Sequence, residues 1–454
     1  MREPSLSSGN EIDKRLDNET LKEFGGSIGV AAIMIGSHAV VYYLWIAWSH
    51  YGGSLVYPAS FSDVFPFFGR MWDHIATDAA PTWWAVKVYV GFLVMQALLA
   101  AFLPGLHIKG LPIPSQNNER LDYNCNGITA WYVTLVVVGV LHFSGVLPLG
   151  LISDNFGPLM TVAIISGNVV AIVIYVGAFV SNNTHRMSGS HPYDFFMGAW
   201  LNPRIGRLDI KMWAEIRVAW IMLFLLTLSA AAKQYEMHGA VSTPMWFMVL
   251  AHFLYANACM KGEECIPTTW DIFYEKWGWM LIYWNLAGVP FVYCFNAQYI
   301  AVQDPFEHST LYTLMCFVML VGAYYVWDTA QSQRNRFRMQ MRGTFVKRLA
   351  FPQLPWGTLE DPEYMQTAQG NKLLVDGWWR YARKIHYTAD ILMALSWGLI
   401  CGFDNFLPYF YVTFFVIMIT HRAVRDMERC KRKYGEDWDQ YCKKVPHTFV
   451  PFLF

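Results

Sequence analysis

The chain has 454 residues, of which 55% are hydrophobic and 17% aromatic, and only 15% are charged. A soluble domain carries nearer a quarter of charged residues, so this composition favours an integral membrane protein. The 34 basic and 34 acidic residues balance, which gives no sign of a nucleic-acid partner. The eight cysteines form no closely spaced metal-type pair, so we interpret them as reduced thiols and expect no bound metal.

The apolar residues lie in long blocks. A helix that spans a membrane needs about 20 mostly apolar residues. The sequence therefore predicts an all-α polytopic membrane fold after a polar tail at 1–25. The predicted transmembrane helices, about ten, lie near residues 26–48, 82–104, 129–151, 157–181, 213–232, 242–260, 277–301, 309–328, 389–405 and 407–421. The last two are short and are joined by a turn, which predicts a helical hairpin.

Basic residues between the apolar blocks predict the orientation. The segment 182–212 carries four Lys or Arg, 329–388 carries ten against four acids, and 421–444 carries eight against five. With ten spans, these three segments follow spans four, eight and ten, so they fall on one side. We predict that this side is cytoplasmic, that the N-terminus lies there, and that one soluble anionic ligand can reach all three segments.

Two basic segments are candidates for binding that ligand. Arg334 and Arg338 are one helical turn apart just past span eight, and a guanidinium matches a phosphate bidentately. The alternative is a positive-inside signal at a membrane boundary. In the tail, Arg422 and Asp426 are spaced to pair on a helix, which would leave Arg425 or Arg429 for a ligand. The alternative there is an amphipathic helix on anionic lipid.

Further candidates combine aromatic and polar groups. The segment 374–387 mixes aromatic and basic residues, which suits stacking on a flat ring, although an interfacial aromatic belt has the same composition. Asp390, at the edge of span nine, is costly inside a membrane and favours a function. Tyr255 lies in span six, and Glu264 follows it. Such groups predict either a structural polar network or a proton donor beside an apolar substrate. No GxGxxG, P-loop, HExxH or GxSxG motif organises a loop.

Two longer motifs carry a resemblance to a known family. GSHPYDFFMGAWLNPR at 189–204 resembles the first signature of the sterol reductase family, and HRxxRDxxxCxxKYGxxWxxY at 421–441 is similar to its second. Members of that family reduce a sterol carbon–carbon double bond with NADPH, and include C-14, C-7 and C-24 reductases. GEECIPTTWD at 262–271 most resembles the fungal-type C-24(28), or Δ24(24(1)), branch.

The resemblance implies a sterol reductase domain at 26–454, with an NADPH pocket in about 309–454. Arg334 and Arg338 would hold phosphates, and Leu374 and Trp379 would line the nicotinamide and ribose region. His386 and Tyr387 stand where many members have Asn-Tyr. The remaining matches to the family's cofactor residues are Arg422, Asp426, Cys430, Tyr434 and Tyr441.

The implied reaction is protonation of the alkene followed by hydride transfer. The candidate acids are Tyr255 and Tyr441, with Asp426 or Glu264 supplying protons. The sterol would enter from the bilayer. Alternatives are a C-14 or C-7 reductase, an isoprenylcysteine-type membrane methyltransferase, whose C-terminal region is similar, and a non-catalytic reductase-like scaffold. The membrane would be the endoplasmic reticulum in a eukaryote or the inner membrane in a bacterium, and the oligomeric state stays open.

Overall fold

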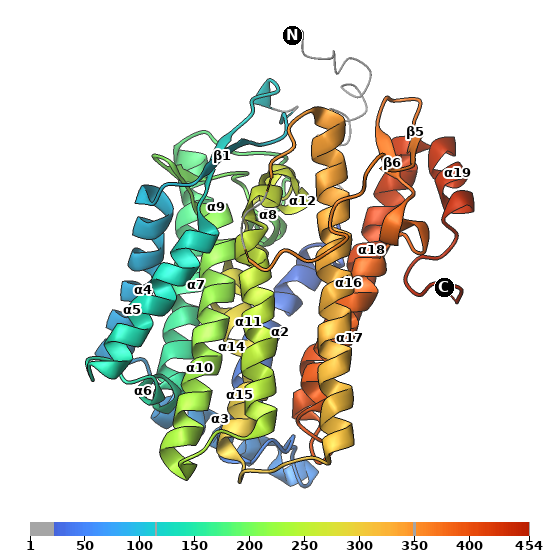
Figure 1. Cartoon of the computed structure of the whole chain (residues 1–454). Coiled ribbons are helices and arrows are strands. Elements are labelled where there is room, and N and C mark those ends of the chain that lie inside the picture. Colours follow the sequence, from blue (N-terminus) through green and yellow to red (C-terminus); the bar gives the residue numbers. More distant parts are fainter. Residues whose placement is uncertain (1–21, 114–115, 348–350, 454) are drawn as a thin grey trace.

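The computed structural model describes residues 22–113, 116–347 and 351–453 (Figure 1). The predicted polar tail at 1–25 therefore lies almost entirely outside the described residues. The longer helices are α2 (Gly26–His50), α3 (Val64–Asp78), α4 (Trp83–Phe102), α5 (Gly127–Phe143), α7 (Phe156–Val180), α10 (Ala219–His238), α11 (Thr243–Lys261), α16 (Thr310–Arg342), α17 (Ile385–Leu399), α18 (Phe410–Tyr434) and α19 (Glu436–Lys444).

Each apolar segment that the sequence predicts as a span is largely helical. Among the described residues, seven helices are long and apolar enough to cross a membrane, and α5 is a shorter apolar helix. The all-α polytopic fold is thus confirmed, while the count of ten spans stays a prediction. The short α17 and the start of α18 pack together as the predicted hairpin.

Two spans are not regular α-helices. The segment predicted at 277–301 as one span is broken into α13 (Trp279–Tyr283), the π-helical η5 (Trp284–Gly288), α14 (Val289–Val292) and α15 (Phe295–Val302). Pro290 has no backbone N–H for the α-helical ladder, which explains a break here. A second π-helical stretch, η3 (Trp213–Val218), precedes α10 and follows α9 (Ile210–Met212).

α16 continues well beyond its apolar part. The Ser309 hydroxyl accepts from Tyr312 N at its start, and Gly343, with φ of 68°, ends it in the left-handed conformation. Its 33 residues span about 50 Å, compared with about 30 Å for the hydrocarbon core of a membrane. The last turns, which carry Arg334 and Arg338, therefore extend out of the apolar layer.

Most of the short helices and strands lie between the predicted spans, in segments for which the sequence pattern predicts no secondary structure. Three two-stranded antiparallel sheets form there, and their registers pair Leu106 with Cys125, Arg204 with Asp209, and Tyr364 with Leu374. The short elements are η1 (Phe61–Asp63), β1 (Leu106–Lys109), β2 (Asp122–Cys125), α6 (Gly150–Asp154), α8 (His191–Met197), β3 (Arg204–Ile205), β4 (Leu208–Asp209), η4 (Glu263–Thr268), α12 (Trp270–Phe273), β5 (Tyr364–Gln366), β6 (Lys372–Leu374), η6 (Gly377–Arg380) and η7 (Leu407–Tyr409).

The three basic segments gather at one end of the helix bundle, as predicted. Figure 1 shows α8, α9, α12, the β5–β6 hairpin and α19 at this end, whereas α3 and α6 lie at the opposite end. Residues remote in the sequence are therefore brought together where α16 and α18 leave the apolar layer.

Candidate active site

The first group in the candidate site joins the end of α16 to η6. The Trp379 indole Nε1 donates to the Ala330 carbonyl at 2.9 Å, which fixes η6 against α16. The Arg334 guanidinium carbon lies 4.7 Å from the centroid of the Trp379 ring. Gly377 permits this approach, because a Cβ there would lie 2.4 Å from Gln333 Oε1. Arg334 and Trp379 thus present a cation and a ring side by side.

The second group lies at the start of α17. The His386 ring centroid lies 5.0 Å from that of Trp379 and 4.1 Å from that of Tyr387. His386 is buried, and within the described part of the chain its Nδ1 has no hydrogen-bond partner. A buried imidazole nitrogen without a partner is costly, so a bound polar group fits here.

A third feature is a cluster of guanidinium groups on α16. Arg338 lies within electrostatic reach of both Arg334 and Arg342. None of the three forms an ion pair with a carboxylate of the described residues. Guanidinium groups that crowd together without a direct ion pair favour an anion such as a phosphate.

On α18 the charges do not pair as the spacing predicts. Asp426 forms an ion pair with the buried Lys384, and Arg422 Nη2 lies 2.7 Å from Asp271 Oδ2. The expected pair of Arg422 with Asp426 is therefore wrong, because carboxylates and amines from other elements lie closer to each partner. Asp426 stays within electrostatic reach of Arg334, so it belongs to the same group.

The two arginines that the sequence leaves for a ligand hold the structure together instead. Arg425 Nε donates to Glu23 Oε1 at 2.8 Å, and its Nη2 lies 3.4 Å from Glu275 Oε1. Arg429 stacks on Trp270, with 3.2 Å from the guanidinium carbon to the ring centroid. These contacts fasten α18 to the segment before α2 and to the segment after η4, so the prediction of a free Arg425 or Arg429 is wrong.

Tyr441 on α19 closes the group. Its hydroxyl lies 3.5 Å from the Leu374 carbonyl oxygen, and Cys430 and Tyr434 pack around it. Burial raises the pKa of Tyr441 to about 12, although the charge of Arg334 acts in the opposite direction. The phenol therefore stays protonated at neutral pH, beside the same guanidinium that faces Trp379.

A separate cluster lies deeper in the bundle. The Tyr255 hydroxyl donates to Asp390 Oδ2 at 3.4 Å, and both side chains are buried. The Tyr255 ring stacks on Trp327 at 4.9 Å between centroids and lies 4.6 Å from Trp220. Tyr411 completes this cage, stacked on Trp397. The sequence does not single out these indoles, since tryptophans in apolar blocks also serve as interface anchors.

One helix face connects the two clusters. His386 and Asp390 are four residues apart on α17, so their side chains lie on the same face one turn apart. His386 contacts Trp379 and Asp390 contacts Tyr255. α17 thus links the basic and aromatic group at the bundle end to the acid and phenol in the interior.

Glu264 lies in a different neighbourhood. It is buried in η4, where Cys265 Sγ lies 3.8 Å from its Oε1 and the Cys125 thiol is within electrostatic reach. The adjacent Glu263 binds Arg217 at 2.7 Å and the Gly127 N–H at 2.6 Å, which ties η4 to α5 and η3. The assignment of Glu264 to proton supply stays a prediction.

Sequence comparison identifies the family of the chain. Residues 18–454 match the model of the ergosterol biosynthesis ERG4/ERG24 family. The chain belongs to this family. The matched region includes the tail that also resembles the isoprenylcysteine-type methyltransferases, and it takes in all the residues of both clusters.

Curated relatives in the ERG4/ERG24 family are similar over nearly the whole chain. The Delta(24(24(1)))-sterol reductase erg4A of Aspergillus fumigatus is 47% identical over 450 residues, covering 97% of this chain and 96% of that protein. The Delta(24(24(1)))-sterol reductase of Gibberella zeae is 45% identical, covering 97% and 74%. The Delta(14)-sterol reductase of Methylotuvimicrobium alcaliphilum is 37% identical, covering 99% and 100%.

Proposed function

We propose that this chain is an NADPH-dependent oxidoreductase that reduces the C-24(28) double bond in the side chain of a sterol. Two relatives with 45–47% identity are named for that bond, compared with 37% for a Delta(14)-sterol reductase. The structural observation that carries the proposal is the face of α17 that joins His386, beside Trp379, to Asp390, beside Tyr255.

The group at the bundle end suits a dinucleotide phosphate. Arg334 and Arg338 would hold its phosphates, and Trp379, Leu374 and the unpartnered His386 Nδ1 would receive the nicotinamide and ribose. Asp426, held by Lys384, would accept from a ribose hydroxyl or the carboxamide. Tyr434, Cys430 and Tyr441 would form the wall behind it. When bound, the dinucleotide supplies the hydride.

The deep cluster suits the proton-transfer half of the reaction. A sterol side chain entering from the bilayer would meet the Tyr255 hydroxyl and take its proton. Asp390, once protonated from solvent, would return a proton to the tyrosinate along the line of their hydrogen bond. Protonation at the terminal carbon of the alkene leaves a tertiary cation. The indoles of Trp220, Trp327 and Trp397 pack around the Tyr255 ring, so they would stabilise positive charge near its hydroxyl and keep water out.

Tyr441 is the second candidate acid. Its raised pKa keeps the phenol protonated, but its hydroxyl faces the Leu374 carbonyl among the residues assigned to the cofactor. We therefore assign Tyr441 to cofactor positioning, together with Asp426, and assign proton donation to Tyr255.

The test is product analysis with isotopic labels. Purified protein is incubated with Δ24(24(1)), Δ14 and Δ7 sterols in D₂O, and separately with NADPH deuterated at nicotinamide C4. We expect reduction of the Δ24(24(1)) sterol alone, with solvent deuterium at the terminal carbon and cofactor deuterium at C-24. Reduction of the Δ14 sterol instead would support the alternative function, and no turnover with NADPH bound would support a scaffold.

Cofactor binding has its own test. Arg338→Ala removes one guanidinium from a crowded group, so the fold gains from reduced repulsion while the phosphate loses a partner. A hydrogen bond to a charged group contributes about 1.5–3 kcal/mol, so we expect roughly 10- to 100-fold weaker NADPH binding by calorimetry. Lys443→Ala, an exposed cation on α19, is the matched control and should leave the affinity unchanged. Equal affinities in both variants would exclude Arg338 from the pocket.

A further inference from the structure

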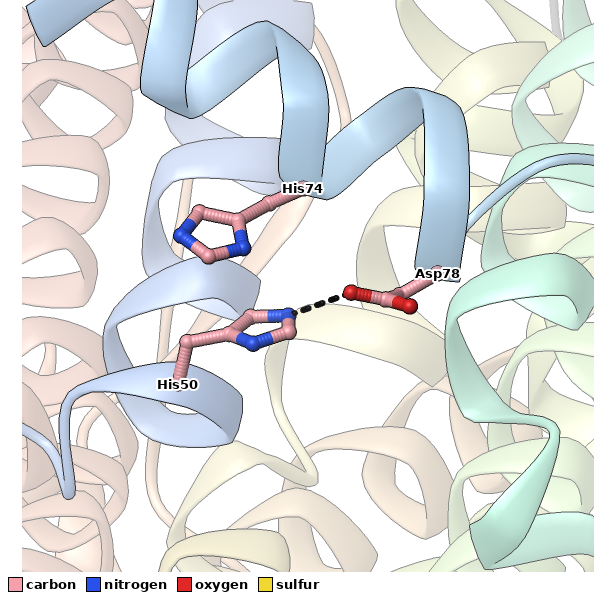
Figure 2. A group of neighbouring side chains, drawn as sticks. All are labelled: His50, His74 and Asp78. Atoms are coloured by element: carbon pink, nitrogen blue, oxygen red, sulfur yellow. Dashed lines mark ion pairs between the residues drawn. The ribbon is translucent and has the colours of Figure 1, made fainter.

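A group of ionisable side chains lies at the bundle end opposite the candidate active site. It comprises His50, the last residue of α2, and His74 and Asp78 on α3 (Figure 2). His74 and Asp78 are four residues apart, so they project from one face of α3 towards α2. Among the described residues, this is the one group of three such side chains whose potential ligand atoms all lie within 4.8 Å of one another.

The geometry of the group is close to that of a metal centre. His50 Nε2 lies 3.6 Å from Asp78 Oδ2, and the two imidazole centroids are 4.0 Å apart. Two ligands bound to zinc at about 2.0–2.1 Å in tetrahedral geometry lie about 3.3 Å from each other. Figure 2 shows a ring nitrogen of His74 on the side that faces His50 and Asp78. The two rings are stacked, with 25° between their planes.

Neighbouring side chains orient the ligands. The Tyr51 hydroxyl lies 3.2 Å from His74 Nε2, which leaves Nδ1 of the same ring for an ion. Trp45 packs edge-on against His50 with 5.3 Å between centroids. Ligating histidines usually hydrogen-bond through their second nitrogen, which fixes the tautomer and the ring orientation.

The backbone around the group is also held in place. Phe67 and Met71 on the inner face of α3 are buried in the main core. At the end of α3, Gly157 of α7 lies so close that a Cβ there would be 2.7 Å from the Asp78 carbonyl oxygen. The group is therefore carried by two helices whose relative position is fixed by packing and not by the charges themselves.

We propose that His50, His74 and Asp78 bind a divalent first-row transition metal ion, with Zn²⁺ as the preferred ion. Two neutral imidazoles and one carboxylate form a donor set that zinc accepts in tetrahedral sites, with water at the fourth position. Magnesium and calcium prefer oxygen ligands alone, so this donor set disfavours them. The ion links the end of α2 to α3 and thereby adds to the packing that holds α3 across the end of the bundle, remote from the reduction chemistry.

The experiment uses the full chain, purified in detergent with an affinity tag that contains no histidine. Co²⁺ is the probe, because its visible absorption reports coordination by imidazole and carboxylate. We expect one Co²⁺ per chain, displaced by Zn²⁺, and a higher melting temperature with either ion. His74→Ala and His50→Ala should each weaken Co²⁺ binding at least tenfold, and Asp78→Asn should weaken it less.

His238→Ala is the matched control, because this exposed histidine ends α10 at the same end of the bundle (Figure 1). It should bind Co²⁺ as the unaltered protein does. Equal Co²⁺ binding by His74→Ala and His238→Ala overturns the proposal, as does the absence of absorption in the unaltered chain. If an alanine variant has a lowered melting temperature without metal, the conservative Asp78→Asn is the deciding variant. An unchanged Co²⁺ affinity of Asp78→Asn counts against the site.

Discussion

Tyr255 donates to Asp390 from a position 135 residues earlier in the chain, inside a cage of indole rings. A carboxyl group buried at this depth is costly unless it has a partner or a function. The pair therefore gives two separate expectations for catalysis, one for each side chain.

At the residue scale, Tyr255→Phe and Asp390→Asn should each lower kcat by about 10²- to 10⁴-fold, the usual contribution of a positioned acid, and leave NADPH affinity unchanged. Single-turnover kinetics and calorimetry measure the two quantities. Tyr312→Phe is the matched control, because Tyr312 also donates to α17, at the Leu399 carbonyl 2.7 Å away. Full turnover by Tyr255→Phe would remove it from the mechanism.

A second expectation at this scale concerns pH and stability. Burial, reinforced by the charge of Arg186, lowers the pKa of Lys276 to about 8. Between this value and about 10.4 the unfolded chain binds more protons at this residue, so stability rises with pH there. Over this whole interval the gain from Lys276 is on the order of 3 kcal/mol.

The change in melting temperature from pH 7.5 to pH 9.5 tests this expectation. This change should be more positive for the unaltered chain than for Lys276→Met. Lys444→Met, at an exposed position, should behave as the unaltered chain does. The same pH dependence in all three proteins would contradict the assignment.

At the scale of elements, α8 and α13 approach through two glycines. A Cβ at Gly278 would lie 2.1 Å from the Gly198 nitrogen and 2.4 Å from the Met197 carbonyl carbon. Both neighbours are backbone atoms, so they cannot move aside without shifting a helix. Gly198 itself has φ of 98° and lies in the first signature of the sequence.

We expect Gly278→Ala to lower the free energy of unfolding by about 3 kcal/mol or more, through a forced separation of α8 from α13. Chemical unfolding in mild detergent measures it. Gly322→Ala, in the middle of α16 with open space around the added methyl group, should be neutral or stabilising by about 1 kcal/mol. Similar stability of the two variants would contradict this account of the close approach.

At the scale of the whole molecule, the basic segments share one end of the bundle, and the proposed metal site lies at the other (Figures 1 and 2). The positive-inside rule then predicts that the end with the basic segments, where we propose that the cofactor binds, faces the cytoplasm. A protease site inserted after Gly370, in the β5–β6 turn, should be cut in sealed vesicles whose cytoplasmic face is outward. A site inserted at 303–309, between α15 and α16, should be protected until detergent is added. The reverse pattern would invert the topology.

The sequence by itself determined the polytopic helical fold, the shared side of the basic segments and the family. Each of these depends on composition or on residues close together in the chain. A run of apolar residues predicts a span whichever helices it packs against. The motifs at 189–204 and 421–441 are each continuous in the sequence, so they can be recognised without the structure.

Only the tertiary structure decided the pairings. Arg422 binds Asp271, 151 residues away, and not the nearby Asp426, which binds Lys384. Likewise Tyr255 meets Asp390, and His50 meets His74, through helix packing. The physical reason is that a charge or hydroxyl pairs with the closest complementary group in space. Chain spacing predicts which groups share a helix face, but it does not predict which groups of other elements lie closer, as Arg422 and Asp426 on α18 show.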